Sequence, residues 1–300
     1  MEEAKRLFLE GNEFFKQGNF DKAKEFYRTA MNLLQLSSQN TEKMHTAHAL
    51  SNLGLLQFAE GRIQEAKSLH EEALQLRRSM EATADQSISD DIEYLAWDMN
   101  RELSSHQQFD RTQTNLISRL KQHDSMDALI SDSLNNLGGC LELSGDYEGA
   151  LQMYSEAVEL RKILFGESHY LVAEVMQNMA TVQSALGHLQ QASDTLHTVL
   201  KVYEAHYGGD SIECAIVLNN IGVVMTQMGM LPNAVDCLDK AYEIRMQQLG
   251  DEHPLTQNVK QNLQYTRNKM AGSLPSSSDK PKMESNETSN FAEEKYPFCK

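Results

Sequence analysis

Asparagine recurs along this chain at a fixed spacing, and its side chain suits one kind of chemistry. Asn52, Asn136, Asn178 and Asn220 follow one another at steps of 84, 42 and 42 residues. An amide side chain carries both donors and an acceptor, so it can pair with the N–H and C=O groups of an extended peptide. Because asparagine is a mediocre helix former, four of them in register indicate a specific role. A binding surface for peptide backbone is one interpretation. A solvated helix face, or asparagines bonded between adjacent repeats, is the alternative.

Three further amides belong to the same candidate surface. Asn135 and Asn219 come directly before two of these asparagines, and Gln177 holds the equivalent place between them. At about 100° per residue, these positions lie well away from the apolar face of the same helices. The sequence therefore places pairs of amides on a second, polar face.

Arginine forms a second column, made of Arg77, Arg161 and Arg245. These side chains could pair with an acidic peptide across a groove. The alternative is an outward-facing charge near the C-terminus of a helix, which the helix dipole favours, and we prefer that interpretation.

Reactive or metal-binding constellations are poorly supported by the sequence. His45 and His48 are three residues apart, but no carboxylate or cysteine joins them at a ligand spacing. His169 and His253 recur 84 residues apart and belong to a repeat rather than to a site. We therefore expect no catalytic residue, no metal and no cofactor.

Glycine and proline indicate the elements that position these side chains. Of the five prolines, none occurs before Pro232, so long uninterrupted helices are permitted. Glycines pair seven residues apart, at positions 11/18, 54/61, 138/145 and 222/229. The later members, with Gly187, step by 43, 84, 42 and 42 residues. Large residues and alanines keep the same register, as close packing of helices requires.

Each unit is predicted to be two helices joined by a glycine-containing turn. The segment from Leu134 to Leu141 has apolar or small residues at i, i+3, i+4 and i+7, which is the pattern of one helix face. A single helix pair cannot bury its own apolar face, so the units must stack into an all-α solenoid. The expected array spans residues 1–270, with clear repeats at about 4–37, 47–80, 131–164, 173–206 and 215–248. A divergent repeat at about 88–123 would be an irregular joint between them, and a helix at 254–270 would cap the array. Residues 271–300 are expected to be disordered.

The pattern resembles the tetratricopeptide repeat, because Gly11 through Met31 meets that family's spacing of small and aromatic residues nearly in full. The 42-residue period and segments such as Leu249-Gly-Asp-Glu-His-Pro254 resemble the kinesin light chain subtype. The resemblance implies a right-handed superhelix whose first helices line a concave groove, where such asparagines hold peptides. Asn12 and Asn52 match asparagines of a chaperone-tail clamp in that family. The basic positions of the clamp hold Phe8, Asp90 and Tyr94 instead, so we expect no carboxylate clamp.

The charge balance constrains the partners. The formal net charge is −16, which argues against nucleic acid and anionic membrane surfaces. The resembled subtype implies peptides with an aromatic residue flanked by acids, but an acidic host favours a basic or amphipathic ligand at least as much. Four cysteines without paired spacing and an acidic, amphipathic N-terminus indicate reduced thiols and a cytoplasmic location.

These observations predict a non-enzymatic scaffold or adaptor that binds an extended peptide or a helix in a groove. Three alternatives stay open at this point. The chain could be a structural subunit of a larger assembly, a cargo adaptor like a kinesin light chain, or a regulator of an enzyme held in its groove.

Overall fold

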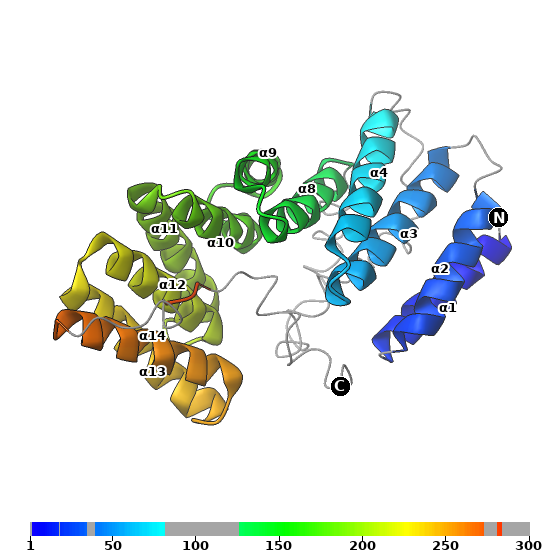
Figure 1. Ribbon diagram of the computed structural model, residues 1–300. Helices are drawn as coiled ribbons and strands as arrows, with labels where there is room; N and C mark the ends of the chain where they lie inside the picture. Colours follow the sequence, from blue (N-terminus) through cyan, green and yellow to red (C-terminus); the bar gives the residue numbers. More distant parts are fainter. Residues whose placement is uncertain (1, 18, 35–39, 82–125, 273–280, 284–300) are drawn as a thin grey trace. The chain divides into compact units, whose positions relative to one another are not determined.

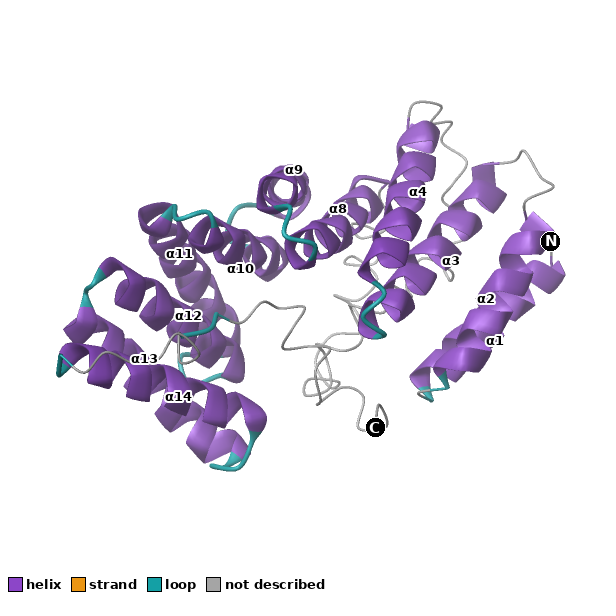
Figure 2. Ribbon diagram, viewed as in Figure 1, coloured by secondary structure: helices purple, strands orange, loops and turns teal. Residues whose placement is uncertain are grey.

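The computed structural model describes residues 2–17, 19–34, 40–81, 126–272 and 281–283, and the regular elements in these ranges are all α-helices (Figures 1 and 2). Consecutive helices pack against one another in pairs. The fold class is therefore an all-α solenoid of helix pairs, as the sequence predicts. The chain forms two compact units, one ending at Leu164 and the other beginning at Phe165.

The described residues of the N-terminal unit form three helix pairs. They are α1 (Glu2–Lys16) with α2 (Phe20–Leu34), α3 (Asn40–Ala59) with α4 (Ile63–Glu81), and α8 (Met126–Leu143) with α9 (Tyr147–Phe165), whose final residue begins the next unit. Contacts between neighbouring pairs, from α2 to α3 and from α4 to α8, join them into one stack.

In the C-terminal unit, the part that the structure describes forms two helix pairs and one further helix. They are α10 (Tyr170–Ala185) with α11 (Leu189–Tyr207), α12 (Ile212–Met228) with α13 (Leu231–Leu249), and α14 (Pro254–Met270). Because α14 packs on α13, it closes the unit at the place where another repeat would begin.

Small residues on the first helix of a pair allow a large side chain of the second helix to lie against the backbone. A Cβ atom on Gly138 would come within 2.6 Å of Cε1 of Tyr154, which is too close for a real contact. Gly11 faces Tyr27 in the same way, at 2.8 Å. Glycine is thus required where an aromatic ring rests on the backbone.

The loop residues of the repeat also have structural roles. Gly229 ends α12 in the left-handed conformation, with φ of 80°, which costs a glycine little. The N–H of Leu171 donates to Nδ1 of His169, and that of Leu255 donates to Nδ1 of His253, each at 3.2 Å. Both histidines therefore cap the helix that follows, so their assignment to the repeat rather than to a site is confirmed.

The helix pairs on either side of residues 82–125 stack directly on each other. Met80 of α4 and Leu129 of α8 belong to one buried cluster, and Arg78 forms an ion pair with Glu156 at 2.5 Å. The divergent repeat expected at 88–123 lies outside the described residues. Because α4 and α8 are in contact, the described helix pairs on either side of this segment form one stack, and the divergent repeat stays a prediction.

Candidate functional site

The eight amides proposed from the sequence are all buried in the structure. None is more than 9% exposed, and Gln177, Asn219 and Asn220 are 0% exposed. A solvated helix face is therefore excluded as their explanation. They lie on the first helices of the pairs, namely Asn12 on α1, Asn52 on α3, Asn135 and Asn136 on α8, Gln177 and Asn178 on α10, and Asn219 and Asn220 on α12.

In the N-terminal unit, two of these asparagines contact each other across neighbouring pairs. Nδ2 of Asn52 donates to Oδ1 of Asn12 at 3.3 Å, and the hydroxyl of Tyr27 donates to the same oxygen at 2.6 Å. Tyr27 is completely buried. The amide oxygen of Asn12 is therefore engaged within the fold and serves as a structural link.

In the C-terminal unit, the asparagines of α12 connect to one on α14. Nδ2 of Asn219 donates to Oδ1 of Asn220 at 3.4 Å, and Nδ2 of Asn262 donates to Oδ1 of Asn219 at 2.9 Å. Asn262 is 3% exposed, and its Nδ2 also lies 3.1 Å from Oδ1 of Asn258. The interpretation as asparagines bonded between adjacent repeats thus describes part of this network.

The amide of Asn262 also binds the main chain of a segment that follows the array. Its Nδ2 donates to the carbonyl oxygen of Lys282, and its Oδ1 accepts from the N–H of Lys282, both at 2.9 Å. Residues 281–283 are thus held against α14, inside the 271–300 segment for which disorder stays a prediction. The remainder of the tail beyond residue 272 lies outside the described residues.

Asn262 is missing from the residues proposed in Sequence analysis, although the register could have identified it. It follows Asn220 by 42 residues, which is the step that separates Asn136, Asn178 and Asn220. The sequence predicts the helix that carries it only as a cap, because it is the last amphipathic helix of the array. Extending the asparagine column by one period would have found it.

The arginine column is buried rather than outward-facing. Arg77, Arg161 and Arg245 are 1%, 7% and 0% exposed, so the interpretation as exposed charges at helix ends is wrong. The guanidinium of Arg77 donates to the carbonyl oxygen of Leu129 and to Ser133 on the next helix, and that of Arg245 to the carbonyl oxygen of Leu255 at 2.7 Å. Arg161 pairs instead with Asp132 at 2.8 Å, within its own helix pair. Each arginine therefore ties helices together, and its burial keeps the guanidinium from direct contact with a ligand at the surface.

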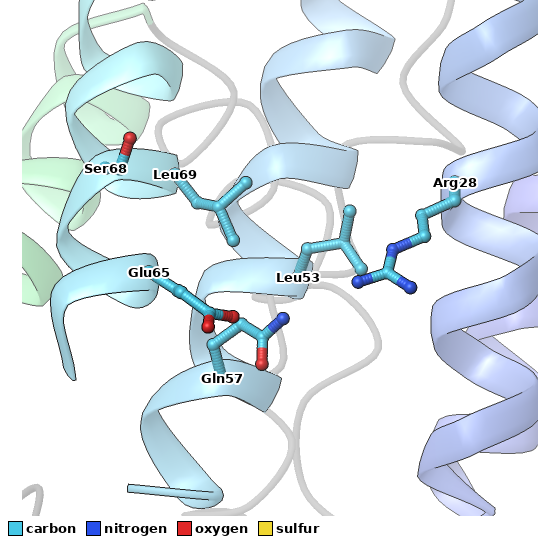
Figure 3. Close-up of a pocket in the computed structure, with 6 residues that line it drawn as sticks. All are labelled: Arg28, Leu53, Gln57, Glu65, Ser68 and Leu69. Carbon is cyan, nitrogen blue, oxygen red and sulfur yellow. The ribbon is translucent and has the colours of Figure 1, made fainter. Parts of the chain in front are cut away.

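A pocket of about 300 Å³ lies between α2, α3 and α4, and none of the asparagines is among its lining residues (Figure 3). Leu53 and Leu69 give it an apolar floor, and Arg28 and Glu65 bring one charge of each sign. The amide oxygen of Gln57 is buried here without a hydrogen-bond partner. Gln57 and Ser68 complete the lining. The lining offers hydrogen bonds and apolar contact rather than a paired nucleophile and base.

Two other classes of site find no support among the described residues. No group of three or more histidine, cysteine and carboxylate side chains in these ranges is arranged to hold a metal ion. None of the helices described is both long enough and apolar enough to cross a lipid bilayer. Cys140, Cys214 and Cys237 are free thiols, of which the first two are buried, as expected for packing residues.

Stacked helix pairs with small residues under large ones define a helical-repeat protein. A family model described as "Tetratricopeptide repeat" matches residues 12–79 and 129–205. The chain is therefore a tetratricopeptide repeat protein, and such repeats form protein-interaction scaffolds.

A relative in sequence is a Clustered mitochondria protein homolog from Emericella nidulans, 33% identical over 132 residues. That alignment covers 43% of this chain and 10% of the relative. The chain thus spans about a tenth of the length of the proteins of this name that it matches.

Two solved structures share the fold. BtubC (BKLC) from P. vanneervenii has a TM-score of 0.57 and 20% identity, with 83% of this chain and 82% of that chain covered. A putative kinesin light chain with nearly identical TPR-like repeats, from Podospora anserina, has a TM-score of 0.51 and 15% identity, with 79% and 90% covered. At these identities the likeness concerns the fold alone, and it includes the kinesin-light-chain-like form of the repeat.

Proposed function

We propose that this protein is a non-enzymatic scaffold that binds an extended peptide through the asparagines of its first helices. The observation that carries the proposal is the pair of hydrogen bonds between Asn262 and the main chain of Lys282, each 2.9 Å long. An amide that hydrogen-bonds to both the N–H and the C=O of one residue recognises the peptide backbone, so this contact does not depend on the side chain of that residue. Each bond contributes about 0.5–1.5 kcal/mol net, so several in a row give useful affinity.

The register supports the same role for the asparagines that precede Asn262. Asn220 and Asn178 lie one and two periods of 42 residues before it, on the equivalent helices α12 and α10. Asn52 and Asn136 continue the column in the N-terminal unit. In our proposal each repeat supplies one amide, so that contacts recur along the bound peptide.

The charge of the protein favours a basic or amphipathic ligand. With a net charge of −16, the scaffold repels an acidic peptide unless basic groups gather at the site. The three arginines that could have supplied positive charge are buried between helices. We therefore propose a ligand that carries lysine or arginine, in preference to an aromatic residue flanked by acids.

The setting that we propose is the cytoplasm, where thiols stay reduced. Cys140 and Cys214 are buried as free thiols, and Cys237 is partly buried and free. Buried thiols of this kind behave as small apolar residues and need no oxidising compartment.

The proposal is tested with peptides selected by the intact protein from a random twelve-residue display library. Affinities are then measured by fluorescence anisotropy for the wild type and for the double variant Asn178→Ala with Asn220→Ala. Loss of two backbone-binding amides should weaken binding about tenfold or more. Gln191→Ala with Asn233→Ala is the matched control, because both are exposed amides on the second helices α11 and α13. Unchanged affinity of the first variant, with helicity retained by circular dichroism, would refute the asparagine site.

A further inference from the structure

The segment Pro281–Met283 rests on the C-terminal unit, where it appears as the short red stretch beside α12 in Figure 1. Pro281 and Met283 are half-buried, whereas Lys282 between them is exposed. Alternation of this kind is typical of an extended chain, in which successive side chains point to opposite sides. The segment thus presents its backbone and every second side chain to the helices.

The amide that receives this segment is also held by neighbouring asparagine side chains. Besides the carbonyl oxygen of Lys282, Nδ2 of Asn262 faces Oδ1 of Asn219 at 2.9 Å and Oδ1 of Asn258 at 3.1 Å, so three acceptors share its two hydrogens. These acceptors fix which end of the amide is nitrogen, and Oδ1 consequently points toward the N–H of Lys282. A preoriented amide loses little entropy on binding, which favours a specific contact.

Met283 supplies an apolar anchor next to this polar contact. It packs against the hydrophobic cluster to which α10, α11 and α12 contribute, and which includes Val217 and Ile221 of α12. Methionine is unbranched and polarisable, so it adapts to such a surface. Lys282, pointing to solvent, adds a positive charge next to an acidic protein.

We infer that Pro281–Met283 is a built-in ligand of the Asn262 site, and that a partner peptide of the same chemistry must displace it to bind there. This inference rests on the proposed function, because it gives the peptide-binding asparagines an occupant within the same chain. The ligand class is an extended peptide whose residue at Asn262 remains in solvent and is followed by a methionine or a similar flexible apolar residue.

A tethered ligand acts as a competitor at high local concentration. Flexible connections give effective concentrations on the order of millimolar, so even a weak intramolecular contact fills its site much of the time. If the segment occupies the site nine times in ten, the apparent affinity for an external peptide falls about tenfold. A partner that binds at Asn262 must therefore outcompete the tail of the protein itself.

Hydrogen exchange of the full chain, measured by mass spectrometry, tests the contact itself. The N–H of Lys282 donates to a buried side chain, so it should exchange at least several-fold more slowly in the wild type than in Asn262→Ala. Gln264→Ala is the matched control, because Gln264 is exposed on the same helix. Equal exchange at Lys282 in the wild type and in Asn262→Ala would overturn the inference.

Competition tests the consequence, with variants in the tail that leave the helices intact. The probe is a fluorescein-labelled peptide of residues 278–287, added to the full chain. Lys282→Pro removes the N–H that Asn262 accepts, whereas Lys282→Ala keeps it and removes only the exposed side chain. The probe should bind Lys282→Pro about tenfold more tightly than the wild type, and Lys282→Ala should bind like the wild type. Equal binding of the probe to all three proteins, or no binding to any, would overturn the inference.

These outcomes are separable from a failure of the proposed function. The library-selected peptides report on Asn178 and Asn220, and they do not depend on the tail. If those peptides lose affinity in the double variant while Lys282 exchanges freely, only the built-in ligand is wrong. If Lys282 is protected while the selected peptides ignore the double variant, the intramolecular contact stands and the wider asparagine site is wrong.

Discussion

The two units fill one repeat position with side chains of different polarity. The position that packs beneath the small residue of the first helix holds Tyr27, His70 and Tyr154 in the N-terminal unit, and Leu196 and Leu238 in the C-terminal unit. All five are completely buried. The N-terminal unit must therefore satisfy polar groups in its core, whereas the C-terminal unit fills the same space with hydrocarbon.

This difference changes what the nearby polar side chains can do. The hydroxyl of Tyr27 donates a hydrogen bond to the amide oxygen of Asn12, and that of Tyr154 donates to a carboxylate oxygen of Glu142 at 3.1 Å. Asn262 of the C-terminal unit faces no such hydroxyl, and its oxygen accepts from the main chain of Lys282. The comparison shows that the amide oxygen of Asn12 is occupied within the core, whereas that of Asn262 accepts from a main-chain N–H.

The largest difference between the two units is expected in how acid lowers the stability of the N-terminal unit. Burial lowers the pKa of His70 to about 3, and both ring nitrogens are buried without a hydrogen-bond partner. Below pH 6.5 the unfolded state therefore binds a proton that the folded state excludes. Stability should fall as the pH drops from about 6.5 toward 3, by as much as about 4 kcal/mol. Urea denaturation at several pH values, followed by hydrogen exchange in each unit, measures this loss.

Exchanging the two residue types should transfer that sensitivity. His70→Leu places the leucine of the C-terminal unit in the N-terminal one and should abolish most of the acid-dependent loss. Leu196→His should introduce an acid-dependent loss into the C-terminal unit. An N-terminal unit that stays equally acid-sensitive after His70→Leu would show that another group is responsible.

A second test concerns Asn12, whose amide oxygen accepts hydrogen bonds within the N-terminal core. Asn12→Ala removes the acceptor of both Tyr27 and Asn52, and leaves buried polar groups behind. We expect a loss of about 2 kcal/mol in the unfolding free energy of the N-terminal unit, and about 1 kcal/mol for Tyr27→Phe. Peptide affinity should not change in either variant. An unchanged denaturation midpoint for Asn12→Ala would contradict the structural role of this residue.

A third test uses Glu142, for which the pH dependence has the opposite sign. Burial raises the pKa of Glu142 to about 7, and the hydrogen bond from Tyr154 opposes this shift. The folded state thus keeps a proton that the unfolded state releases above its ordinary pKa of 4.5. Stability should fall as the pH rises from about 4.5 to 7 and then level off. Glu142→Gln should remove this dependence, and at pH 8 it should stabilise the unit by about 1 kcal/mol.

The smallest effect is expected at exposed ion pairs, where the two units should not differ. Arg78–Glu156 lies in the N-terminal unit and Arg267–Asp239 in the C-terminal one, with side chains 39–50% exposed. Alanine in place of either arginine should cost less than about 0.5 kcal/mol and little at high salt. A much larger loss of stability in one unit only would mean that the two units differ in their surface ion pairs as well as in their cores.

The sequence allowed the fold to be predicted well, because glycine, alanine and large residues recur at a fixed period. It also placed the asparagines on the correct helices, since period and helix geometry are local properties. The stacking of α4 on α8 could not be predicted, because residues 82–125 separate them in sequence and only tertiary contact joins Met80 to Leu129. The arginine column was misjudged for a similar reason. Charge and position suggested exposure, whereas its partners are backbone carbonyls and side chains on other helices.

The sequence by itself determined that the chain is a stack of helix pairs with amides in register, because a 42-residue period records which residues must pack together. Tertiary structure alone decided which amide oxygen bonds within the core and which one accepts from the main chain of another segment. A hydrogen-bond partner is chosen by distance in space. Tyr27 reaches Asn12 from the neighbouring helix, and Lys282 reaches Asn262 from a segment twenty residues further along the chain. Neither hydrogen bond can be predicted from the spacing of the repeat.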